Sequence, residues 1–483
     1  MLNESNYTML LDYYELTMSN GYFLSEKSEE IAYFDVFFRK IPDGGGFAIA
    51  AGLEQVINYI KDLKFTKEDI AFLKEKGIFD DKFLDYLSNF KFTGDIWAVP
   101  EGTPIFPGEP ILTVRGKAVE TQLIETFVLL TINHQSLIAT KANRIVRAAE
   151  GRPIMEFGAR RAQGIDGAIN GARAAFIGGC AATSCTISDR RFGVPAAGTM
   201  AHSWVQMFDS EYDAFVAYCK TYPHGATLLI DTYDIFGSGI KNAIKAFKEV
   251  LIPQGINNFG VRIDSGDIAY ITKKLRKILK EEGLPQCKIV VSNSLDERII
   301  ADLIKQGAEI DSFGVGERLI TSKSEPVFGG VYKLVATEND GNIVPKIKIS
   351  ENPEKITNPG FKKLYRIFDK ETGKAQADLI TLYDEVIDTG APLEIFDPQN
   401  TWKRKTFESY ELKELLEPIF IGGKLVYEVP TTKESKDYCL NQVDLLWDEV
   451  KRFENPHTYY VDLSQKLWDL KNELLRSFRK SKQ

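Results

Sequence analysis

Strands and helices alternate over six consecutive units between about residues 150 and 338, and this alternation restricts the possible folds more than any other feature of the sequence. Each unit begins with a short apolar run and ends in small or polar residues before a helical stretch; the runs are PIMEF, VPAA, ATLLI, GVRI, KIVV and IDSF. The runs do not alternate between apolar and polar residues, which indicates strands buried on both faces. The segment therefore predicts an α/β fold in which helices cover a parallel sheet.

Two architectures fit this alternation, a (β/α) barrel and a doubly wound sheet. A doubly wound sheet that binds a dinucleotide typically has the motif G-x-G-x-x-G after its first strand, and this motif is absent here. Polar residues follow every predicted strand at its C-terminal end, where barrel enzymes form their active sites. We therefore favour the barrel.

The regions on either side of this segment have a different character. The N-terminal region mixes helix and strand signals with a stretch at 92–116 in which proline and glycine separate short β runs. A long helix predicted at 118–149 carries basic residues along one side, which we interpret as a solvated face. The three predicted domains are an N-terminal α/β domain (1–140), an α/β barrel domain (141–340) and a C-terminal mixed β and helical region that packs on the N-terminal domain (341–483).

Charge and composition exclude several classes of function. The chain has 60 Lys and Arg against 68 Asp and Glu, a net charge of −8, which argues against a broad nucleic-acid or anionic-membrane surface. No apolar run approaches the ~18 residues that span a bilayer, and the first residues do not resemble a secretory signal. The five cysteines are scattered and odd in number, as expected of reduced thiols. We expect a cytoplasmic protein that binds neither nucleic acid nor a membrane.

Charged side chains follow three of the predicted strands. Arg160 and Arg161 in EFGARRAQG offer planar, paired donors for a carboxylate or a phosphate, or alternatively pair with Glu156 or Asp166. His202 follows the strand VPAA and is a candidate catalytic group. Asp264 follows GVRI, with Arg262 two residues earlier on the same strand face. A carboxylate there could hold Mg²⁺, bind ribose hydroxyls or stabilise a developing cationic sugar, or could simply cap a helix.

The other strand ends supply further candidates. Ser292 and Asn293 end the strand KIVV, and Gly314 and Gly316 lie at the last junction, where backbone N–H groups could hold a phosphate. Three further aspartates lie after strands, and each could act in the site or cap a helix. These are Asp231, Asp234 and Asp267.

Several motifs together resemble the nicotinate phosphoribosyltransferase family. They are EFGARRAQGIDGAINGARAAFIGGCAATS, PAAGTMAHSW, GVRIDSGD, VSNSLDE and GGVYKLVA, in that order. The resemblance extends from LLDYYELTMSNGYF near the N-terminus to NPHTYYVDLS near the C-terminus, so it covers nearly the whole chain. It implies a type II phosphoribosyltransferase with an irregular (β/α) barrel, an N-terminal α/β domain and a homodimeric assembly with sites near the subunit interface. The implied reaction joins nicotinate to phosphoribosyl pyrophosphate, releases nicotinate mononucleotide and pyrophosphate, and is coupled to ATP hydrolysis as the first step from nicotinate towards NAD.

The resemblance also implies roles for individual residues. His202 matches the histidine that the family phosphorylates, and Arg262 and Asp264 lie in its RxDSGD motif. The matches to its nicotinate site are Tyr14, Arg160 and Thr199. The residues expected at its phosphates are Arg161, Ser292, Asn293, Gly314, Gly316 and Thr321. Mg²⁺ is the expected metal, with Asp264 as its protein ligand, and ATP is the expected co-substrate.

The chain departs from the family pattern in three places. It has Leu-Asp-Tyr-Tyr where Thr-Asp-x-Tyr is common, Thr-Ser-Cys where Thr-Ser-Asn is usual, and Gly-Val-Gly-Glu where Gly-Val-Gly-Thr is usual. The last change places Glu317 beside the expected phosphate loop. Two other functions remain open, nicotinamide phosphoribosyltransferase and a catalytically idle barrel that binds a phosphorylated metabolite. An arginine suits the carboxylate of nicotinate, whereas an amide would need an acceptor.

Overall fold

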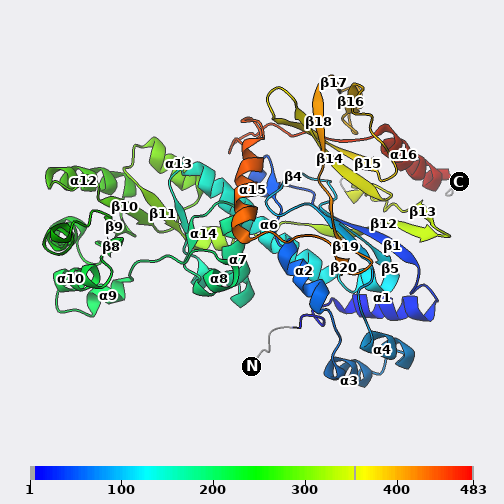
Figure 1. The fold of residues 1–483 in the computed structure, drawn as a ribbon, viewed down its shortest axis with the longest axis horizontal. Helices are drawn as coiled ribbons and strands as arrows, with labels where there is room; N and C mark the ends of the chain where they lie inside the picture. Colours follow the sequence, from blue (N-terminus) through cyan, green and yellow to red (C-terminus); the bar gives the residue numbers. More distant parts are fainter. Residues whose placement is uncertain (1–5, 353–354, 481–483) are drawn as a thin grey trace. The chain divides into compact units, whose positions relative to one another are not determined.

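The computed structural model describes residues 6–352 and 355–480, and the chain divides into two compact units (Figure 1). Unit 1 contains the chain up to Leu137, residues Val327–Pro430 and the chain from Asp437 onward. Unit 2 contains Ile138–Pro326 and Thr431–Lys436. Within the described ranges, no helix is both long enough and apolar enough to cross a membrane. The division into three consecutive domains at residues 140 and 340 stays a prediction.

Unit 1 is built on antiparallel strands from both halves of the chain. The elements of its N-terminal part are α1 (Tyr13–Leu24), β1 (Ile31–Phe37), β2 (Ala48–Ile49), α2 (Leu53–Asp62), α3 (Lys67–Glu75), α4 (Asp81–Ser88), β3 (Asp95–Ala98), β4 (Pro104–Ile105), β5 (Leu112–Lys117), α5 (Ala118–Gln122) and α6 (Glu125–Ala148), whose last residues belong to unit 2. The elements of its C-terminal part are β12 (Val331–Asn339), β13 (Asn342–Pro345), β14 (Lys362–Asp369), β15 (Ala375–Leu382), β16 (Leu393–Phe396), β17 (Arg404–Phe407), β18 (Tyr410–Glu414), β19 (Glu417–Ile421), β20 (Lys424–Leu425), α15 (Thr432–Asp444), which starts in unit 2, β21 (Val461–Leu463) and α16 (Gln465–Lys480).

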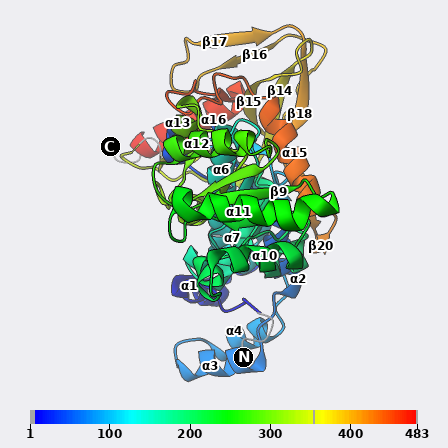
Figure 2. The ribbon, with the colours of Figure 1, turned by 90° about the vertical axis from the view of Figure 1, so that its left-hand side faces the viewer.

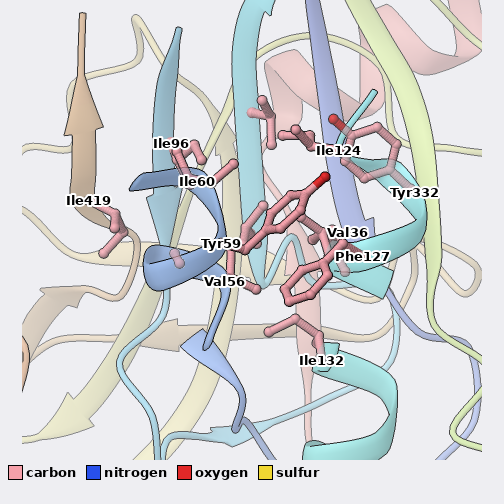
Figure 3. Packing of buried hydrophobic residues seen from close by; sticks show 14 of the residues in the cluster. Val36, Val56, Tyr59, Ile60, Ile96, Ile124, Phe127, Ile132, Tyr332 and Ile419 are labelled. Atoms are coloured by element: carbon pink, nitrogen blue, oxygen red, sulfur yellow. The ribbon is translucent and has the colours of Figure 1, made fainter. Parts of the chain in front are cut away.

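The sheets of unit 1 share one hydrophobic core. Seven strands form an antiparallel sheet in the order β13-β12-β1-β5-β3-β19-β20, and four form a second sheet in the order β18-β14-β15-β21. Helix α2 contributes one apolar face, because its apolar residues recur at helical spacing, and Tyr59 stacks on Phe127 with ring centroids 3.9 Å apart (Figure 3). The same cluster includes Val36 of β1 and Tyr332 of β12, so segments about 300 residues apart in sequence are packed together.

Unit 2 has the strand–helix alternation that the sequence predicts. Its elements are β6 (Ile154–Glu156), α7 (Ile165–Ile177), β7 (Ala182–Thr183), α8 (Thr186–Phe192), α9 (His202–Gln206), α10 (Glu211–Thr221), β8 (Ala226–Leu229), α11 (Ile240–Ala246), β9 (Phe259–Ile263), α12 (Ile268–Glu281), β10 (Lys288–Ser292), α13 (Glu297–Lys305), β11 (Ser312–Val315) and α14 (Glu317–Ile320). Figure 2 shows α10 and α11 side by side on the outside of the sheet. Helices α12 and α13 begin where the sequence supplies caps, since Asp267 accepts from Tyr270 N and Asp296 from Ile299 N.

The six strands of unit 2 form a curled, half-barrel parallel sheet in the order β7-β6-β11-β10-β9-β8. The first strand, β6, pairs with the last, β11, and the strands between follow in sequence order. This cyclic order is that of a barrel interrupted between β7 and β8, and no ladder joins those two strands within the described residues. The predicted α/β class and parallel sheet are confirmed at this level.

Two sequence-based expectations, one in each unit, were wrong in detail. The run VPAA does not form a strand; Thr183 of β7 makes a single bridge to Ala196, because Pro195 has no N–H to continue a ladder. The helix predicted at 118–149 is interrupted between α5 and α6, at Leu123 and Ile124.

Candidate active site

Five of the six parallel strands deliver candidate residues to one edge of the sheet, because the carboxyl ends of parallel strands face the same way. Asp231 follows β8 by two residues, Asp264 follows β9 directly, and Ser292 is the last residue of β10. Arg160 and Arg161 follow β6, and Gly316 follows β11. The sequence-predicted residues of unit 2 therefore lie on neighbouring connections along one rim.

Asp264 is at the centre of the arrangement. Its Oδ1 accepts a hydrogen bond from Ser292 Oγ at 3.0 Å, and its Oδ2 lies 4.0 Å from His202 Nε2. The other ring nitrogen of His202, Nδ1, lies 3.1 Å from Thr232 Oγ1. His202 is the first residue of α9, and its side chain is 41% exposed while both ring nitrogens have polar neighbours. The imidazole at the start of α9 thus faces the carboxylate at the end of β9.

Arg262 and Thr199 form a second pair beside this one. The Nη1 of Arg262 donates a hydrogen bond to Thr199 Oγ1. Burial lowers the pKa of the Arg262 guanidinium, the carboxylates of Asp264 and Asp231 oppose that effect, and the positive charge of Arg160 adds to it. The buried Nε of Arg262 has no hydrogen-bond partner among the described residues. The site therefore holds two guanidinium groups close enough to repel, an arrangement that an anion would relieve.

Asp231 belongs to the same cluster. Its Oδ2 accepts from Asp264 N and from Ser265 Oγ, both at 2.7 Å, so it holds the β9 connection in place. Its Oδ1 is buried and has no hydrogen-bond partner in the described structure. The sequence left open whether Asp231 acts in the site or caps a helix, and the structure places its carboxylate against the connection that carries Asp264. By contrast, Asp234 caps the turn that follows, accepting from Phe236 N and Gly237 N.

Arg160 and Arg161 are exposed, in a short 3₁₀ turn (Ala159–Arg161) after β6. The alternative that they pair with Glu156 does not hold, because that carboxylate is buried and accepts from Thr183 Oγ1 at 2.6 Å and from Gly158 N. Neither arginine forms an ion pair with any residue the structure describes. Both remain available to an anionic ligand.

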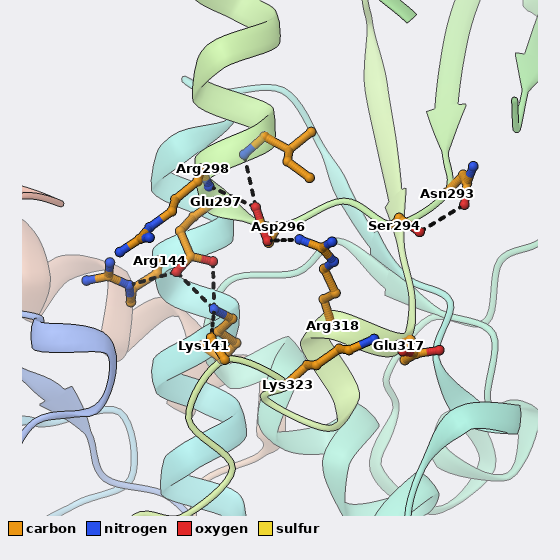
Figure 4. A network of polar contacts seen from close by, with 12 residues as sticks. Lys141, Arg144, Asn293, Ser294, Asp296, Glu297, Arg298, Glu317, Arg318 and Lys323 are labelled. Atoms are coloured by element: carbon orange, nitrogen blue, oxygen red, sulfur yellow. Dashed lines mark hydrogen bonds and ion pairs between the residues drawn. The ribbon is translucent and has the colours of Figure 1, made fainter. Parts of the chain in front are cut away.

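The late loop contains an acid within its basic surroundings. Glu317 Oε1 pairs with Lys323 Nζ at 2.6 Å, and this contact, with smaller contributions from Arg161 and Arg318, holds the pKa of Glu317 below its usual range (Figure 4). Thr321 Oγ1 donates to the carbonyl of Glu317 at 2.7 Å. The carboxylate of Glu317 therefore neutralises Lys323 and lies within the electrostatic reach of Arg161 and Arg318.

Three other residues of the expected phosphate set have local structural roles. A Cβ on Gly314 would lie 2.5 Å from the ring of Phe157, so close packing alone requires glycine there. Asn293 has a positive φ of 92° and accepts from Ser294 Oγ at 3.1 Å. Gly316 approaches Phe157 as well, since a Cβ there would lie 3.1 Å from its carbonyl oxygen.

Tyr14 belongs to unit 1, on helix α1. Its side chain is 44% exposed, and it lies near the carboxylate of Glu125. Partial burial, followed by the negative charge of Glu125, raises the pKa of Tyr14, so the hydroxyl stays protonated at neutral pH.

The basic residues of α6 are not the solvated face that we expected. Lys141 and Arg144 are 2% and 3% exposed, and both contact Glu297 of α13, which is 4% exposed (Figure 4). A charged stripe on a helix normally indicates a face in contact with solvent. The expectation failed because the buried partner of this stripe is about 150 residues away in the chain. Close by, Arg318 pairs with Asp296, the cap of α13.

Comparison with known proteins agrees with this geometry. Models of the nicotinate phosphoribosyltransferase N-terminal domain, family and C-terminal domain match residues 9–133, 153–376 and 361–471. A nicotinate phosphoribosyltransferase of Bacillus subtilis is 42% identical over 468 residues, covering 97% of this chain and 95% of the relative. The crystal structure of human nicotinic acid phosphoribosyltransferase superposes with a TM-score of 0.84 at 29% identity, covering 96% of this chain and all of the other. A Pyrococcus furiosus structure described as a nicotinate-nucleotide pyrophosphorylase has a TM-score of 0.69 at 25% identity, covering 92% and 97%.

Relatives above 30% identity extend over nearly the full length of the chain, and the family models match the segments that carry the clustered strand ends. This chain belongs to the nicotinate phosphoribosyltransferase family.

Proposed function

We propose that this protein joins nicotinate to phosphoribosyl pyrophosphate, giving nicotinate mononucleotide and pyrophosphate as a step of NAD salvage. The observation that carries the proposal is the single cluster in which His202, Asp264 and Arg262 meet at the carboxyl edge of the unit 2 sheet. The sheet, on this proposal, is the parallel wall of an irregular (β/α) barrel, and its strand order supports that description.

The chemistry requires orientation and charge more than proton transfer. Departure of pyrophosphate leaves an oxocarbenium-like anomeric carbon, and the pyridine nitrogen of nicotinate is already a nucleophile, so no general base is needed. Asp264 would stabilise the sugar as positive charge develops, because its carboxylate is fixed by Ser292 and by the Asp231-held backbone. Arg262 and Arg161 would bind the phosphates of the leaving group. Holding the two substrates together in the reacting geometry would supply the remaining rate enhancement.

Mg²⁺ fits the oxygen donors of this cluster. The buried Oδ1 of Asp231 lacks a hydrogen bond and lies on the residue that bonds to the Asp264 backbone, and carboxylate oxygens are the ligands that Mg²⁺ prefers. The described residues contain no group of three or more His, Cys, Asp or Glu side chains that could hold a metal by themselves. Asp264 and Asp231 would therefore hold the ion together with substrate phosphates, and the ion would neutralise the leaving pyrophosphate.

ATP is proposed to act through phosphorylation of His202. The Nε2 lies on the opposite side of the ring from Thr232, and a phosphoryl group there would add a dianion to a site that also contains Arg262 and Arg160. The new charge would reorganise those arginines and tighten the site for phosphoribosyl pyrophosphate. We expect His202→Ala to abolish stimulation by ATP while leaving slow, ATP-independent transfer. Retention of full ATP coupling in that variant would overturn the assignment.

Nicotinate, rather than nicotinamide, is the proposed pyridine. Arg160 forms no ion pair with the described residues, and Thr199 accepts from Arg262, so guanidinium and hydroxyl donors are available to a carboxylate. Tyr14 would stack on the pyridine ring, in a homodimer whose sites lie near the subunit interface. These last two statements extend the family resemblance to this chain.

Competition between the two pyridines tests the function. The purified protein is incubated with phosphoribosyl pyrophosphate, Mg²⁺, labelled ATP and equal concentrations of nicotinate and nicotinamide, and both mononucleotides and acid-labile phosphoprotein are measured. We expect nicotinate mononucleotide to dominate and label to appear on His202. Preference for the amide would select the nicotinamide enzyme, whereas binding of phosphoribosyl pyrophosphate without pyrophosphate release would indicate an idle barrel.

A further inference from the structure

A large cavity in unit 1 is formed around the motif NPHTYYVDLS, which the proposed reaction does not use. Its volume is about 910 Å³, and it is bounded by the β16–β17 hairpin, the approach to β21 and the segment around Gly45. Every residue that lines it belongs to unit 1. Ligand sites in proteins have volumes of this order.

Asp462 makes this cavity unusual. It lies in β21, is 5% exposed and lines the cavity, and its carboxyl group makes no hydrogen bond or ion pair with any described residue. Burial, reinforced by the negative charge of Asp397, raises the pKa of Asp462 to about 6. A buried carboxyl group without partners costs stability. Such a cost is expected where the group is retained to bind something.

Aromatic faces stand around this carboxyl group. Trp402 is 78% exposed and Tyr460 is also exposed, although both line the cavity. His457 meets Tyr460 edge to face at 5.7 Å, and the ring of Tyr459 stacks on Phe106 at 3.9 Å, which fixes the wall behind them. Exposed aromatic rings on the wall of a cavity offer stacking surfaces to a planar ligand.

Positive charge lies on the hairpin that forms the rim. Lys403 and Arg404 are already paired, with Asp397 and Glu394. Lys405 donates to the neutral amide oxygen of Gln376 at 2.9 Å and has no ion pair with the residues the structure describes. The lining therefore offers a lysine that forms no ion pair with the described residues and an aspartate that forms no hydrogen bond with them, together with several aromatic faces. The reaction proposed for unit 2 uses none of these groups.

We propose that this cavity binds a nucleotide, with the base stacked on Trp402 and Tyr460, a ribose hydroxyl or base amino group donating to Asp462, and phosphate at Lys405. A nucleotide has a planar ring that can stack on the aromatic side chains, a hydrogen-bond donor for Asp462 and an anionic group for Lys405. A simple phosphate would leave the aromatic faces and Asp462 unused, and an apolar ligand would leave Lys405 and Asp462 unsatisfied. The proposal is independent of the reaction assigned to unit 2.

Calorimetric titration of the full chain with AMP tests the proposal, because AMP carries a base, ribose and phosphate but cannot donate a γ-phosphoryl group. We expect saturable binding, quenching of tryptophan fluorescence, and weaker binding of adenosine and of ribose 5-phosphate. Trp402→Ala should weaken AMP binding by about 5- to 100-fold, the loss expected when one base–aromatic stack is removed. Because Trp402 is largely exposed, this variant should fold normally.

Asp462→Leu supplies a second readout. It should abolish AMP binding while the melting temperature is unchanged or higher, since an unpartnered buried carboxyl group is replaced by an apolar side chain. Asp264→Asn is the control for binding at the unit 2 edge and should leave the AMP affinity unchanged. The proposal is overturned if AMP does not bind at millimolar concentration, if the Trp402 variant binds like the wild type, or if the affinity is lost only in the Asp264 variant.

Discussion

Replacing Glu297 by glutamine should strongly destabilise unit 2. Glu297 lies between two cations, with Lys141 Nζ at 2.8 Å from Oε2 and Arg144 Nε at 3.2 Å from Oε1. All three side chains are at most 4% exposed. Glutamine keeps the shape and the acceptor oxygen but removes the negative charge, so both cations lose this carboxylate in a region that water hardly reaches.

The expected cost is about 3–5 kcal/mol, the usual loss when one partner of a buried ion pair is removed. In a unit of 150–250 residues each kcal/mol lowers the melting temperature by about 2–4 °C, so the transition of unit 2 should fall by about 6–20 °C. Burial lowers the pKa of the neighbouring Arg147 to about 10, with the charge of Arg144 adding to the effect and Glu297 opposing it, so loss of the carboxylate lowers that pKa further.

Differential scanning calorimetry of Glu297→Gln measures the effect directly. The matched control is Glu281→Gln, since Glu281 is exposed and pairs loosely with Lys277 at 3.8 Å. The free energy of unfolding should change by less than about 1 kcal/mol in this variant. The double variant Lys141→Met with Glu297→Met should recover part of the loss, because apolar side chains need no counter-charge. Equal melting temperatures for Glu297→Gln and Glu281→Gln would refute the reasoning.

Two further predictions concern acidic residues. Glu317→Thr removes the carboxylate that pairs with Lys323 and lies near Arg161. In steady-state assays, KM for phosphoribosyl pyrophosphate should fall several-fold with kcat little changed, because those cations become available to the phosphates. An unchanged or higher KM would contradict this. Burial raises the pKa of Glu15 to about 7 despite two hydrogen bonds from Thr126, so the folded state keeps a proton that the unfolded state loses. The free energy of unfolding of unit 1 should therefore decrease as pH rises from about 4.5 to about 7, on the order of 3 kcal/mol from this group. Denaturant unfolding at several pH values should show that Glu15→Gln removes this part of the slope, and an identical slope in the variant would exclude Glu15 as its source.

Local sequence signals were sufficient to predict the parallel sheet of unit 2 and the edge at which the candidate side chains gather. Buried strands read as continuous apolar runs, and the residue after each run must lie at the carboxyl edge, so Asp264 and Ser292 could be placed next to one another before any coordinates. The same argument applied to Asp231, but a strand-end aspartate is also a common cap, and Asp234 and Asp267 do act as caps.

Long-range pairings were beyond the reach of these signals. The contact between Lys141 and Glu297 joins residues 156 positions apart, and nothing in either local pattern distinguishes it from two solvated charges. The shared core of unit 1 likewise depends on strands from both ends of the chain, such as β1 and β12. The break between α5 and α6 and the missing strand at VPAA are set by tertiary packing and by Pro195 rather than by hydrophobic pattern.

The rate of nicotinate mononucleotide formation by two aspartate variants tests most directly whether the strand-end cluster is the reacting centre. Asp264→Asn removes the carboxylate that meets His202 and Ser292, whereas Asp234→Asn alters an exposed aspartate that only caps a neighbouring turn. The account predicts that kcat/KM falls by about 100-fold or more in Asp264→Asn and by only a few-fold in Asp234→Asn, with the same melting temperature for both. Wild-type kcat/KM in Asp264→Asn, or equal losses in the two variants, would contradict it.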